Sequence, residues 1–410
     1  MTIAPTLSAI TAWLDAVPNR ERTGEFRDMQ LEGVRALLKL LPAVPRPCTL
    51  AGTKGKGSTA RFIECALRES GEPTVAFTSP HVSSVLERWR VDGESAEVDI
   101  IAECCTQVAA LEVAHALSLT YFERTFAIAC LLVARRPGTR FILEVGLGGR
   151  LDCANALDCA IAVITHLSHD HRDILGPTLH HIAREKLAVT RNDAPVVIAP
   201  QTAIATLAIW RELAKFRVAT KFQRLPRSNI LPNVQTVWVQ SSVSTYDLPL
   251  LGEHQQDNAA TAAAVLRLWA PQVDDAMMRR GFARATLAAR CQMIEQSRRR
   301  LLIDGAHNRE SIAATIQVAM RQLRPDWRLI IGVATDKEID EIISILPRNI
   351  IIARCGYHSP RARTMTNWPS AAQAWPWFDD ISTALAAHPA DVDLCVTGSF
   401  YLAAEALAAF

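Results

Sequence analysis

This 410-residue sequence lacks several features that mark special classes of protein. Its longest fully apolar stretch, residues 126–134, has about half the length that a membrane-spanning helix needs. The first residues show no basic segment followed by an apolar one, so we expect no signal peptide. No charge of one sign dominates, because 44 Lys and Arg face 42 Asp and Glu. We therefore expect a cytoplasmic protein that binds neither nucleic acid nor membranes.

Paired cysteines are also missing. The ten cysteines are scattered and none forms a Cys-x-x-Cys motif, which speaks against a disulfide framework and against a cysteine-based zinc site. We expect reduced thiols in the protein core. Glycine and proline are not in excess and 49% of the residues are hydrophobic, so disordered and collagen-like chains are excluded.

What is present is an alternation of short apolar strands with helical segments, which favours an α/β fold around a parallel sheet. The strand candidates in the first part of the chain are residues 48–51, 74–78, 141–145, 160–165 and 196–199. A second alternation has strand candidates at residues 301–303, 328–333, 350–353 and 392–396. The alternation of strands and helices stops at residues 221–250. The pattern of this segment predicts a small antiparallel excursion, that is, a short antiparallel β element.

The length of the chain suggests two or three domains. We predict a larger N-terminal α/β domain over residues 1–287, a linker at about 288–296, and a smaller α/β domain over 297–410. No internal repeat of solenoid period is present.

A glycine-rich loop, Gly52-Thr-Lys-Gly-Lys-Gly-Ser58, follows the first strand candidate and opens a helix. Glycines let backbone N–H groups approach phosphate oxygens, and Lys56 would reach the terminal phosphates of a nucleotide. Gly57 stands where the usual pattern has Ser or Thr, so Ser58 or Thr59 would face magnesium. An ordinary glycine turn is the alternative, but the flanking lysines favour phosphate binding.

Polar residues also follow two other strand candidates. Glu144 ends one of them, at the edge of the sheet where ligands of α/β proteins collect. Another runs into His166-Leu-Ser-His-Asp-His-Arg-Asp173. This histidine-rich segment has three interpretations: a zinc site with unfamiliar spacing, one imidazole that helps to hold Mg²⁺ beside nucleotide phosphates, or a solvated loop.

In three further segments the residue types alone do not distinguish a functional role from a structural one. Glu185 and Lys186 have the charge pattern of a solvated helix face. Asp304, directly after a strand candidate, can bind ribose hydroxyls, whereas Asn308 can equally be a helix N-cap. The basic run 298–300 is typical of a solvated hairpin, since the aromatic platforms of a nucleic-acid site are absent.

A series of motifs occurs in a fixed order from about residue 25 to residue 410. They are Gly52–Ser58, Thr78–His81, Thr120–Glu123, Leu143–Asp152, Asp170-His171, Ala183–Lys186, Asp304–Asn308, Asp336-Lys337, Ser359–Arg361 and Thr397–Phe400. In these motifs the chain resembles the folylpolyglutamate synthase / dihydrofolate synthase family, part of the Mur ligase superfamily.

The resemblance implies a P-loop ATPase domain with a parallel sheet, a smaller C-terminal Rossmann-like domain, and an active site in the cleft between them. It implies a monomer whose small-molecule substrates are ATP, L-glutamate and a pteroate- or folate-like acid. It also implies the reaction: ATP phosphorylates a carboxylate, and the amino group of glutamate then attacks the acyl phosphate. The implied cofactors are two Mg²⁺ ions and a monovalent cation.

The resemblance further assigns roles to residues. The ATP phosphates would be held by Thr53, Lys54, Gly55, Lys56, Gly57 and Ser58, and the nucleotide also by Asn258, Arg290 and Asp304. The magnesium ligands would be Ser79, Glu144 and His171. The pteroate pocket would be lined by Thr120, Tyr121, Phe122, Glu123, Leu151, Asp152 and Cys153. Lys186 matches a carbamylated lysine, an anionic oxygen donor, and with Lys56 and His307 it completes the catalytic set.

The sequence departs from the family mainly on the acid side. The family's Leu-Asp-Ala-Thr-Asn reads Leu151-Asp-Cys-Ala-Asn155 here, which removes a hydroxyl beside the pterin pocket. A glycine of the segment that touches dihydropteroate is replaced in Phe26–Glu32 by a residue such as Arg27. In the phosphate loop Lys54 replaces Asn, and Ala288-Ala289-Arg290 replaces Pro-Gly-Arg before the domain crossover.

Three hypotheses follow. The first is a ligase that joins L-glutamate to a pteroate or folate acid. The second keeps this chemistry but changes the acid, as the altered pterin loop suggests. The third is a nucleotide-binding regulatory protein without catalysis, against which the retention of Ser79, Glu144, His171 and Lys186 argues. The sequence does not distinguish the first glutamate addition from later ones.

Overall fold

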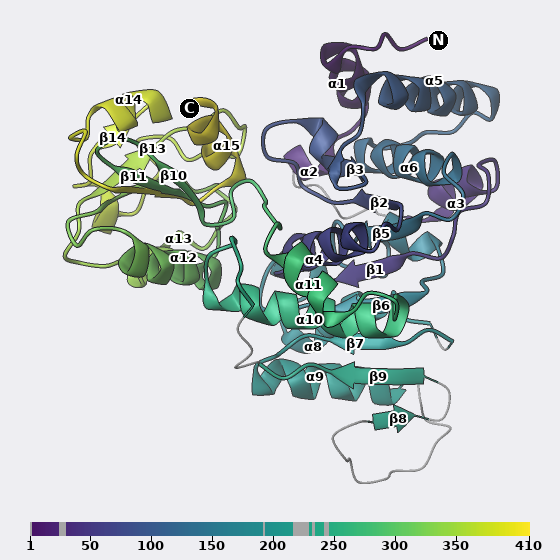
Figure 1. Cartoon of the computed structure of the whole chain (residues 1–410). Coiled ribbons are helices and arrows are strands. Elements are labelled where there is room, and N and C mark those ends of the chain that lie inside the picture. Colours follow the sequence, from purple (N-terminus) through teal and green to yellow (C-terminus); the bar gives the residue numbers. More distant parts are fainter. Residues whose placement is uncertain (1, 24–29, 192, 216–228, 232–233, 242–245) are drawn as a thin grey trace. The chain divides into compact units, whose positions relative to one another are not determined.

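The computed structural model describes residues 2–23, 30–191, 193–215, 229–231, 234–241 and 246–410 (Figure 1). The chain forms two compact units. The N-terminal unit comprises residues 1–81, 85–248 and 254–285, and the C-terminal unit comprises residues 82–84, 249–253 and 286–410. Residues 288–296, the predicted linker, therefore belong to the C-terminal unit.

The N-terminal unit is built on a mixed sheet that has nine strands in the described residues. In spatial order these are β4 (Glu94–Ser95), β3 (Trp89–Val91), β2 (Thr74–Phe77), β5 (Arg140–Glu144), β1 (Cys48–Ala51), β6 (Ile161–Ile164), β7 (Val196–Ile198), β9 (Val234–Trp238) and β8 (Asn229–Leu231). The six strands from β2 to β9 run parallel. The predicted parallel sheet is confirmed, and its central strands β1, β2 and β6 are buried along their whole length, as parallel strands covered on both faces require.

Helices connect and cover these strands. They are α1 (Leu7–Asp15), α2 (Arg20–Thr23), α3 (Glu32–Leu38), α4 (Lys56–Glu69), α5 (Val98–Ala114), α6 (Tyr121–Ala134), α7 (Arg172–Leu175), α8 (Leu179–Leu187), α9 (Ala203–Lys215), α10 (Glu253–Trp269) and α11 (Asp275–Phe282), with 3₁₀ turns η1 (Val85–Arg88) and η2 (Cys153–Ala156). The apolar stretch 126–134 forms the buried part of α6. Phe62 of α4 packs edge-on against Phe282 of α11, with ring centroids 5.2 Å apart.

The antiparallel excursion predicted for residues 221–250 is present as the pair β8–β9. It is not separate from the sheet, because β9 also pairs in parallel with β7 and thereby satisfies the backbone groups of that strand. Val243, one of the residues behind the prediction, lies outside the described residues.

The C-terminal unit has a six-stranded sheet in the order β10 (Gln292–Glu295), β11 (Arg300–Ile303), β15 (Leu394–Thr397), β12 (Arg328–Ile331), β13 (Ile352–Cys355) and β14 (Trp377–Phe378). All neighbours are parallel except β10 and β11. The basic run 298–300 thus belongs to the β10–β11 hairpin, as predicted.

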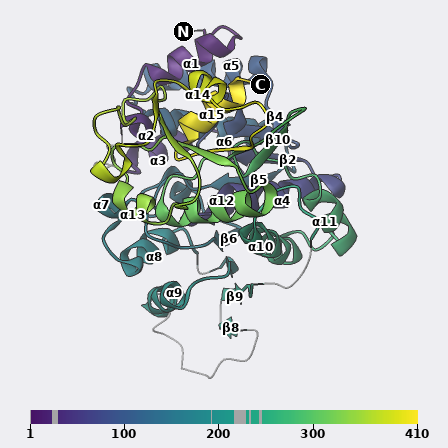
Figure 2. The same ribbon diagram turned by 90° about the vertical axis from the view of Figure 1, so that its left-hand side faces the viewer.

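Helices cover both faces of this second sheet, with α12 (Arg309–Gln322) and α13 (Ile339–Ser344) on one face and α14 (Ile381–Ala386) and α15 (Phe400–Ala408) on the other (Figures 1 and 2). A short 3₁₀ turn, η3 (Ser370–Ala372), precedes β14. Alternate strand residues supply the two cores: Leu302 packs with α12 and α13, whereas Leu301 and Ile303 pack with α14 and α15. This is the doubly wound α/β arrangement that the alternation of strands and helices indicates.

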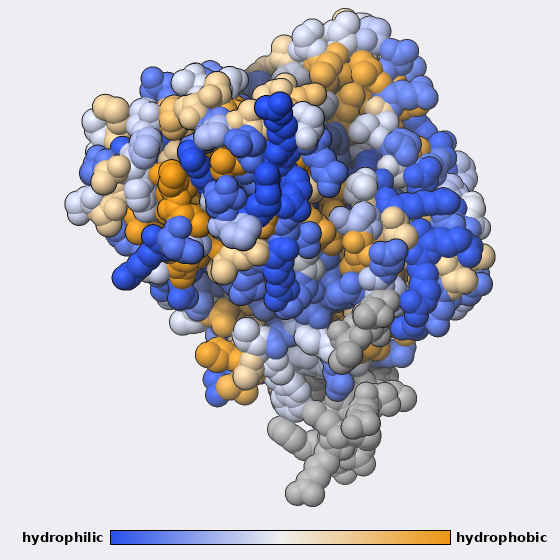
Figure 3. All heavy atoms as spheres, turned by 60° about the vertical axis from the view of Figure 1, so that its left-hand side comes forward, coloured by the Kyte–Doolittle hydropathy of each residue, from blue (hydrophilic) through white to orange (hydrophobic). Residues whose placement is uncertain are grey.

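The expectation of reduced core thiols is confirmed, since all ten cysteines are buried and unpaired. On the face of the molecule drawn in Figure 3, hydrophobic residues gather in separate patches among hydrophilic ones. Among the described helices, none combines the length and the apolar character needed to cross a bilayer.

Candidate active site

The glycine-rich loop joins β1 to α4 and is shaped by two glycines. A Cβ atom on Gly52 would lie 1.8 Å from Oγ1 of Thr165, so no side chain fits there. Gly55 is the N-cap of α4 with a φ of 84°, and its Cβ would lie 2.2 Å from Oδ1 of Asn258. The loop therefore passes close to α10 and ends at the N-terminus of a 14-residue helix, a place that favours anions.

Two lysine amines meet at the carbonyl oxygen of Gly52. Nζ of Lys56 donates to it over 3.1 Å, and Nζ of Lys186 donates to it over 2.9 Å. Nζ of Lys56 also lies 3.9 Å from Oε1 of Glu144. Two lysine amines and one buried carboxylate thus surround the start of the loop.

The environment of Lys186 differs most from what the charge pattern of its helix indicates. Its side chain is buried, so the interpretation of Lys186 as part of a solvated helix face is wrong. Burial, and next the nearby charge of Lys56, lower the pKa of the Lys186 amine from 10.5 to about 7. Its neighbour Glu185 is partly exposed and pairs with Arg150 at 2.7 Å. A helix places adjacent residues about 100° apart, and the charge pattern alone did not show which one turns inward.

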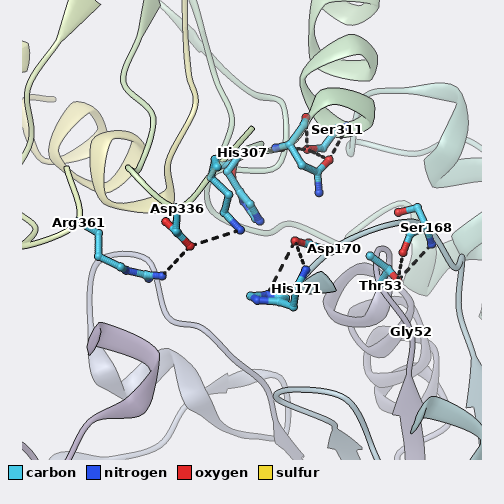
Figure 4. A network of polar contacts seen from close by, with 12 residues as sticks. Gly52, Thr53, Ser168, Asp170, His171, His307, Ser311, Asp336 and Arg361 are labelled. Atoms are coloured by element: carbon cyan, nitrogen blue, oxygen red, sulfur yellow. Dashed lines mark hydrogen bonds and ion pairs between the residues drawn. The ribbon is translucent and has the colours of Figure 1, made fainter. Parts of the chain in front are cut away.

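The segment after β6 is fastened to the glycine-rich loop (Figure 4). Oγ1 of Thr53 donates to the carbonyl oxygen of Ser168 over 3.1 Å and accepts from the N–H of Ser168 over 3.2 Å. The N–H groups of Thr53 and Lys54 both donate to the carbonyl oxygen of His166. Thr53 and Lys54 of the predicted phosphate loop therefore hold the histidine-rich segment in place. This segment is thus not a free solvated loop.

That segment ends at Asp170 and His171, which lie side by side in Figure 4. The carboxylate of Asp170 accepts from the N–H of His171 over 3.0 Å, and His171 has a left-handed backbone with a φ of 49°. Such a conformation is uncommon outside glycine and often marks a functional position. Nothing supports the zinc interpretation, because no cluster of three His, Cys, Asp or Glu residues suited to a metal occurs in the described residues.

Ser79 and Glu144 are brought together by two neighbouring strands. Oε2 of Glu144 accepts from the backbone N–H of Ser79 over 3.2 Å, and Glu144 is buried. A carboxylate and a hydroxyl are the hard oxygen donors that Mg²⁺ prefers, and an imidazole such as that of His171 can complete such a set. The donor chemistry of these three side chains therefore fits a magnesium ion.

A buried ionic network that the sequence interpretation missed supports the Ser79 loop. Glu64 accepts from Arg61 over 2.9 Å and from Arg90 over 2.8 Å, and Arg90 also donates to Oγ1 of Thr78 over 2.9 Å. Buried charges are tolerated when they are paired in this way. The available signal was the sequence Arg88-Trp-Arg90, which places an arginine on each side of an apolar residue at the junction of η1 and β3.

Arg88, which the sequence interpretation also missed, contacts His81 at the end of the motif Thr78–His81. Its Nε donates to Nδ1 of His81 over 2.9 Å, and its guanidinium lies 5.2 Å from the ring centroid of Tyr121. Burial, followed by the positive charge of Arg88, lowers the pKa of His81 to about 3. His81 is therefore neutral at physiological pH, and the motif Thr78–His81 is rigidly supported.

The predicted pteroate-pocket residues gather around the N-terminus of α6 and the turn after β5. Thr120 and Glu123 form a reciprocal capping box, which gives both a structural reason to be present. Phe122 lies 5.6 Å from the ring of Phe77 and packs onto Gly146, whose Cβ would lie 2.6 Å from it. Leu151 and Cys153 flank Asp152 on the same turn. Residues 26–29, including Arg27, lie outside the described residues.

Asp152 organises that turn. Its carboxylate accepts from the backbone N–H groups of Gly146, Leu147 and Ala154, each over 3.0 Å. Burial raises the pKa of Asp152 from 3.8 to about 6 despite these hydrogen bonds.

This raised pKa predicts a pH dependence of stability. Between pH 4 and pH 6 the unfolded chain releases the Asp152 proton before the folded chain does, so the free energy of unfolding should fall as the pH rises through this window. In Asp152→Asn this contribution should vanish, which denaturant titrations from pH 4 to pH 7 would reveal as a flatter profile. Asp274→Asn, which alters only the N-cap of α11, is the control. Parallel profiles of parent and Asp152→Asn would contradict the assignment.

In the C-terminal unit, Asp304 and His307 follow β11. The carboxylate of Asp304 is buried, and Nδ1 of His307 lies 3.0 Å from the carbonyl oxygen of Gly305. Asn308 caps α12 through a reciprocal pair with Ser311, as its N-cap interpretation predicts (Figure 4). Arg290 lies in the turn before β10, with its guanidinium 4.5 Å from the ring centroid of Phe400.

Comparison with known proteins identifies the family of this chain. Residues 50–266 match the family model of the Mur ligase middle domain. The dihydrofolate synthase/folylpolyglutamate synthase of Escherichia coli (strain K12) is 32% identical, over 98% of this chain and 95% of that protein.

Solved structures are similar over the full length. That of E. coli FolC in complex with DHPP and ADP has a TM-score of 0.82 and 27% identity, covering 100% of this chain and 98% of the other. That of a bifunctional folylpolyglutamate synthase/dihydrofolate synthase with Mn, AMPPNP and L-glutamate bound has a TM-score of 0.82 and 26% identity, covering 100% and 99%. With its glycine-rich loop, its paired lysines and its two α/β units, this chain belongs to the folylpolyglutamate synthase / dihydrofolate synthase family of the Mur ligase superfamily.

Proposed function

We propose that this protein is an ATP-dependent ligase that joins L-glutamate to the carboxylate of a pteroate or folate acid. The observation that carries the proposal is the convergence of Lys56, Lys186 and Glu144 on the glycine-rich loop. It occurs in a chain that matches a dihydrofolate synthase/folylpolyglutamate synthase over 98% of its length. In the reaction a carboxylate oxygen of the acid takes the terminal phosphoryl group of ATP, and ADP leaves. The glutamate amine then attacks the carbonyl carbon and displaces phosphate.

The protein contributes mainly position and charge to these steps. The N-terminus of α4 and the amine of Lys56 offset the charge of the phosphates. Ser79, Glu144 and His171 would hold a magnesium ion, which neutralises phosphate charge when it is bound. Asn258 lies against the loop and, together with Arg290, is proposed to contact the nucleotide.

Lys186 is proposed to act as a carbamate. Carbon dioxide reacts with an unprotonated amine, and a pKa of about 7 leaves much of the Lys186 amine unprotonated at neutral pH. The carbamate replaces a positive charge by an anionic oxygen donor. Such a donor suits a site that holds a divalent cation, whereas an uncharged or cationic amine does not.

The acid is proposed to lie near Phe122 and Asp152, where an aromatic ring packs on the turn after β5. The hypothesis of a different carboxylic acid stays open on the same ground, since Cys153 and Ala154 replace the family's Ala and Thr at this turn.

A direct assay tests the function. The purified protein is incubated with Mg²⁺, ATP and L-glutamate, and with either dihydropteroate or tetrahydrofolate, while phosphate release is followed and products are weighed by mass spectrometry. We expect phosphate release that requires both the acid and glutamate, and a product heavier by one glutamyl unit. Lys56→Ala is the inactive control. Turnover with neither folate acid would reject the proposal, and turnover with another carboxylic acid would establish the second hypothesis.

A further inference from the structure

His81 ends the motif Thr78–His81 and has no assigned role in the candidate site. It follows Ser79 by two positions, and the N–H of Ser79 donates to the buried carboxylate of Glu144 over 3.2 Å. The side chain of His81 is half-buried. Within the described residues its imidazole makes a single hydrogen bond, which Nδ1 receives from Nε of Arg88 over 2.9 Å. A histidine close in the chain to the predicted magnesium ligands thus keeps one ring nitrogen for another partner.

Arg88 is held so that its Nε faces His81. The side chain of Arg88 is buried, and both of its terminal nitrogens donate to the carboxylate of Glu21 in α2. Its guanidinium lies 5.2 Å from the ring centroid of Tyr121, the first residue of α6. A guanidinium that has an ion pair at one edge and an aromatic ring at its face has little freedom to turn.

The contact with Arg88 fixes the position of the proton on the His81 ring. The Nε–H of arginine can only donate, so Nδ1 of His81 must accept through its lone pair. The single proton of the neutral ring then lies on Nε2. No lone pair is left to take up a further proton, so His81 cannot act as a general base. Its Nε2–H, in contrast, is a donor that makes no hydrogen bond within the part of the chain that the structure describes.

His81 is linked to the region proposed for the acid. Through Arg88 it is joined to Tyr121, which is next to Phe122 in α6. The ring of Phe122 lies 5.6 Å from that of Phe77 in β2, the strand that leads into the motif of His81. A carboxylate accepts hydrogen bonds and has no proton to donate, so a neutral ring that donates from Nε2 matches it.

We propose that Nε2–H of His81 donates to a carboxylate oxygen of the acid substrate, and that Arg88 is the positioning residue that keeps the proton on Nε2. The proposal rests on the proposed function, in which ATP phosphorylates this carboxylate. The donor serves the oxygen that stays unphosphorylated. That oxygen becomes the carbonyl oxygen of the acyl phosphate and bears negative charge when the amine of glutamate attacks, so a hydrogen bond there favours the reaction.

Two amide substitutions test the two ring nitrogens separately. The amide of asparagine reaches the place of Nδ1, and that of glutamine, which is longer by a methylene group, reaches the place of Nε2. His81→Asn can still accept from Arg88 but lacks the outer donor, so kcat/KM for the acid should fall on the order of 30-fold. His81→Gln restores an N–H near Nε2 and should recover most of this loss. The Kd for ADP should stay within about twofold of the parent in both variants.

The opposite pattern identifies a purely structural histidine. If His81 serves only as an acceptor for Arg88, His81→Asn should match the parent and His81→Gln should be impaired. That result, or a glutamine variant no better than the asparagine variant, would overturn the proposal. His115→Asn, at the exposed C-cap of α5, is the control and should behave as the parent.

Arg88→Lys tests the positioning role. Lysine keeps the charge that pairs with Glu21 but lacks the planar fork that holds a carboxylate and an imidazole together. It should lower kcat/KM for the acid on the order of tenfold, with the Kd for ADP unchanged. In a His81→Asn background the same change should have less than about a twofold effect, because the group that Arg88 positions is gone. Fully multiplicative effects of the two substitutions would contradict the positioning role.

Nuclear magnetic resonance of the full chain, labelled with ¹⁵N-histidine, reads the ring without altering it. The signal that is absent from the spectrum of His81→Gln assigns His81. We expect an unprotonated Nδ1 and a protonated Nε2 in the parent, and the opposite tautomer would refute the proposal. Because this spectrum and ADP binding need neither the acid nor glutamate, a failure of the proposed ligase function would show in the ligation assay alone.

Discussion

Replacing Lys186 by methionine should lower kcat on the order of 100-fold or more, while the KM for ATP changes little. Methionine keeps the length and most of the packing of the buried side chain but has no amine. The glycine-rich loop keeps its glycines and Lys56, so we expect the nucleotide still to bind. What disappears is the group that, as a carbamate, would place an anionic oxygen beside the phosphates.

The carbamate adds a specific signature to this expectation. In a parent enzyme depleted of carbon dioxide, added bicarbonate should restore activity, and the restoration should be more complete above pH 7, where the Lys186 amine is unprotonated. Bicarbonate should have no effect on Lys186→Met or on Lys186→Ala. Lys39→Met, at the exposed end of α3, is the control and should behave as the parent. Equal turnover of parent and Lys186→Met would remove the carbamate from the mechanism.

Asp393→Asn should cost the C-terminal unit about 2–4 kcal/mol of stability at pH 7. Asp393 is buried and accepts from the side chains of Arg300 and Arg324 and from both of their backbone N–H groups. Burial alone would raise its pKa, but these hydrogen bonds outweigh burial and hold the pKa of Asp393 well below 3.8. An asparagine cannot offset the two guanidinium charges, although their own exposure to solvent screens part of the loss.

Denaturant unfolding at several pH values measures this cost. The contribution of a carboxylate with a lowered pKa is complete above the unfolded-state value of about 4 and is lost as the pH falls toward the folded-state value. The difference in the free energy of unfolding between the parent and Asp393→Asn should therefore become smaller below pH 4. Asp193→Asn is the matched control, because Asp193 pairs with Arg46 on the surface, where solvent screens the pair, so this substitution should change the free energy of unfolding little. A loss as small as that of the control would contradict the role of Asp393.

Local patterns predicted the elements well where burial and composition agree. The strand prediction at residues 48–51 matches β1, and the candidates at 74–78 and 301–303 match β2 and β11 within a residue or so at their ends. The hairpin β3–β4 was missed, although its two-residue turn, Asp92-Gly93, carries the residues that positive φ values favour. Its strands are only three and two residues long, too short for an alternating pattern to appear.

In the candidate site, too, some residues could be predicted from local sequence patterns and others could not. The glycine-rich loop and Glu144 are local signals, because a strand end and its turn are contiguous in the sequence. The partners that support them are not contiguous: Arg90 of β3 reaches Glu64 of α4, and Lys186 reaches Gly52 across 134 positions. Only the motif order, through its resemblance to a family, pointed to Lys186 before the structure did.

The amino-acid sequence by itself determined the α/β class, the position of the glycine-rich loop and the membership of a ligase family, because each depends on residues that are neighbours in the chain or on motifs in order. The tertiary structure decided which charges are buried and which groups they face. It turned Lys186 inward beside Lys56, paired Asp393 with Arg300 and Arg324, and set Asp304 against the turn of Arg290. Charge patterns leave such choices open, because the energy of a charged group depends on its solvation and partners, and packing alone brings those partners together.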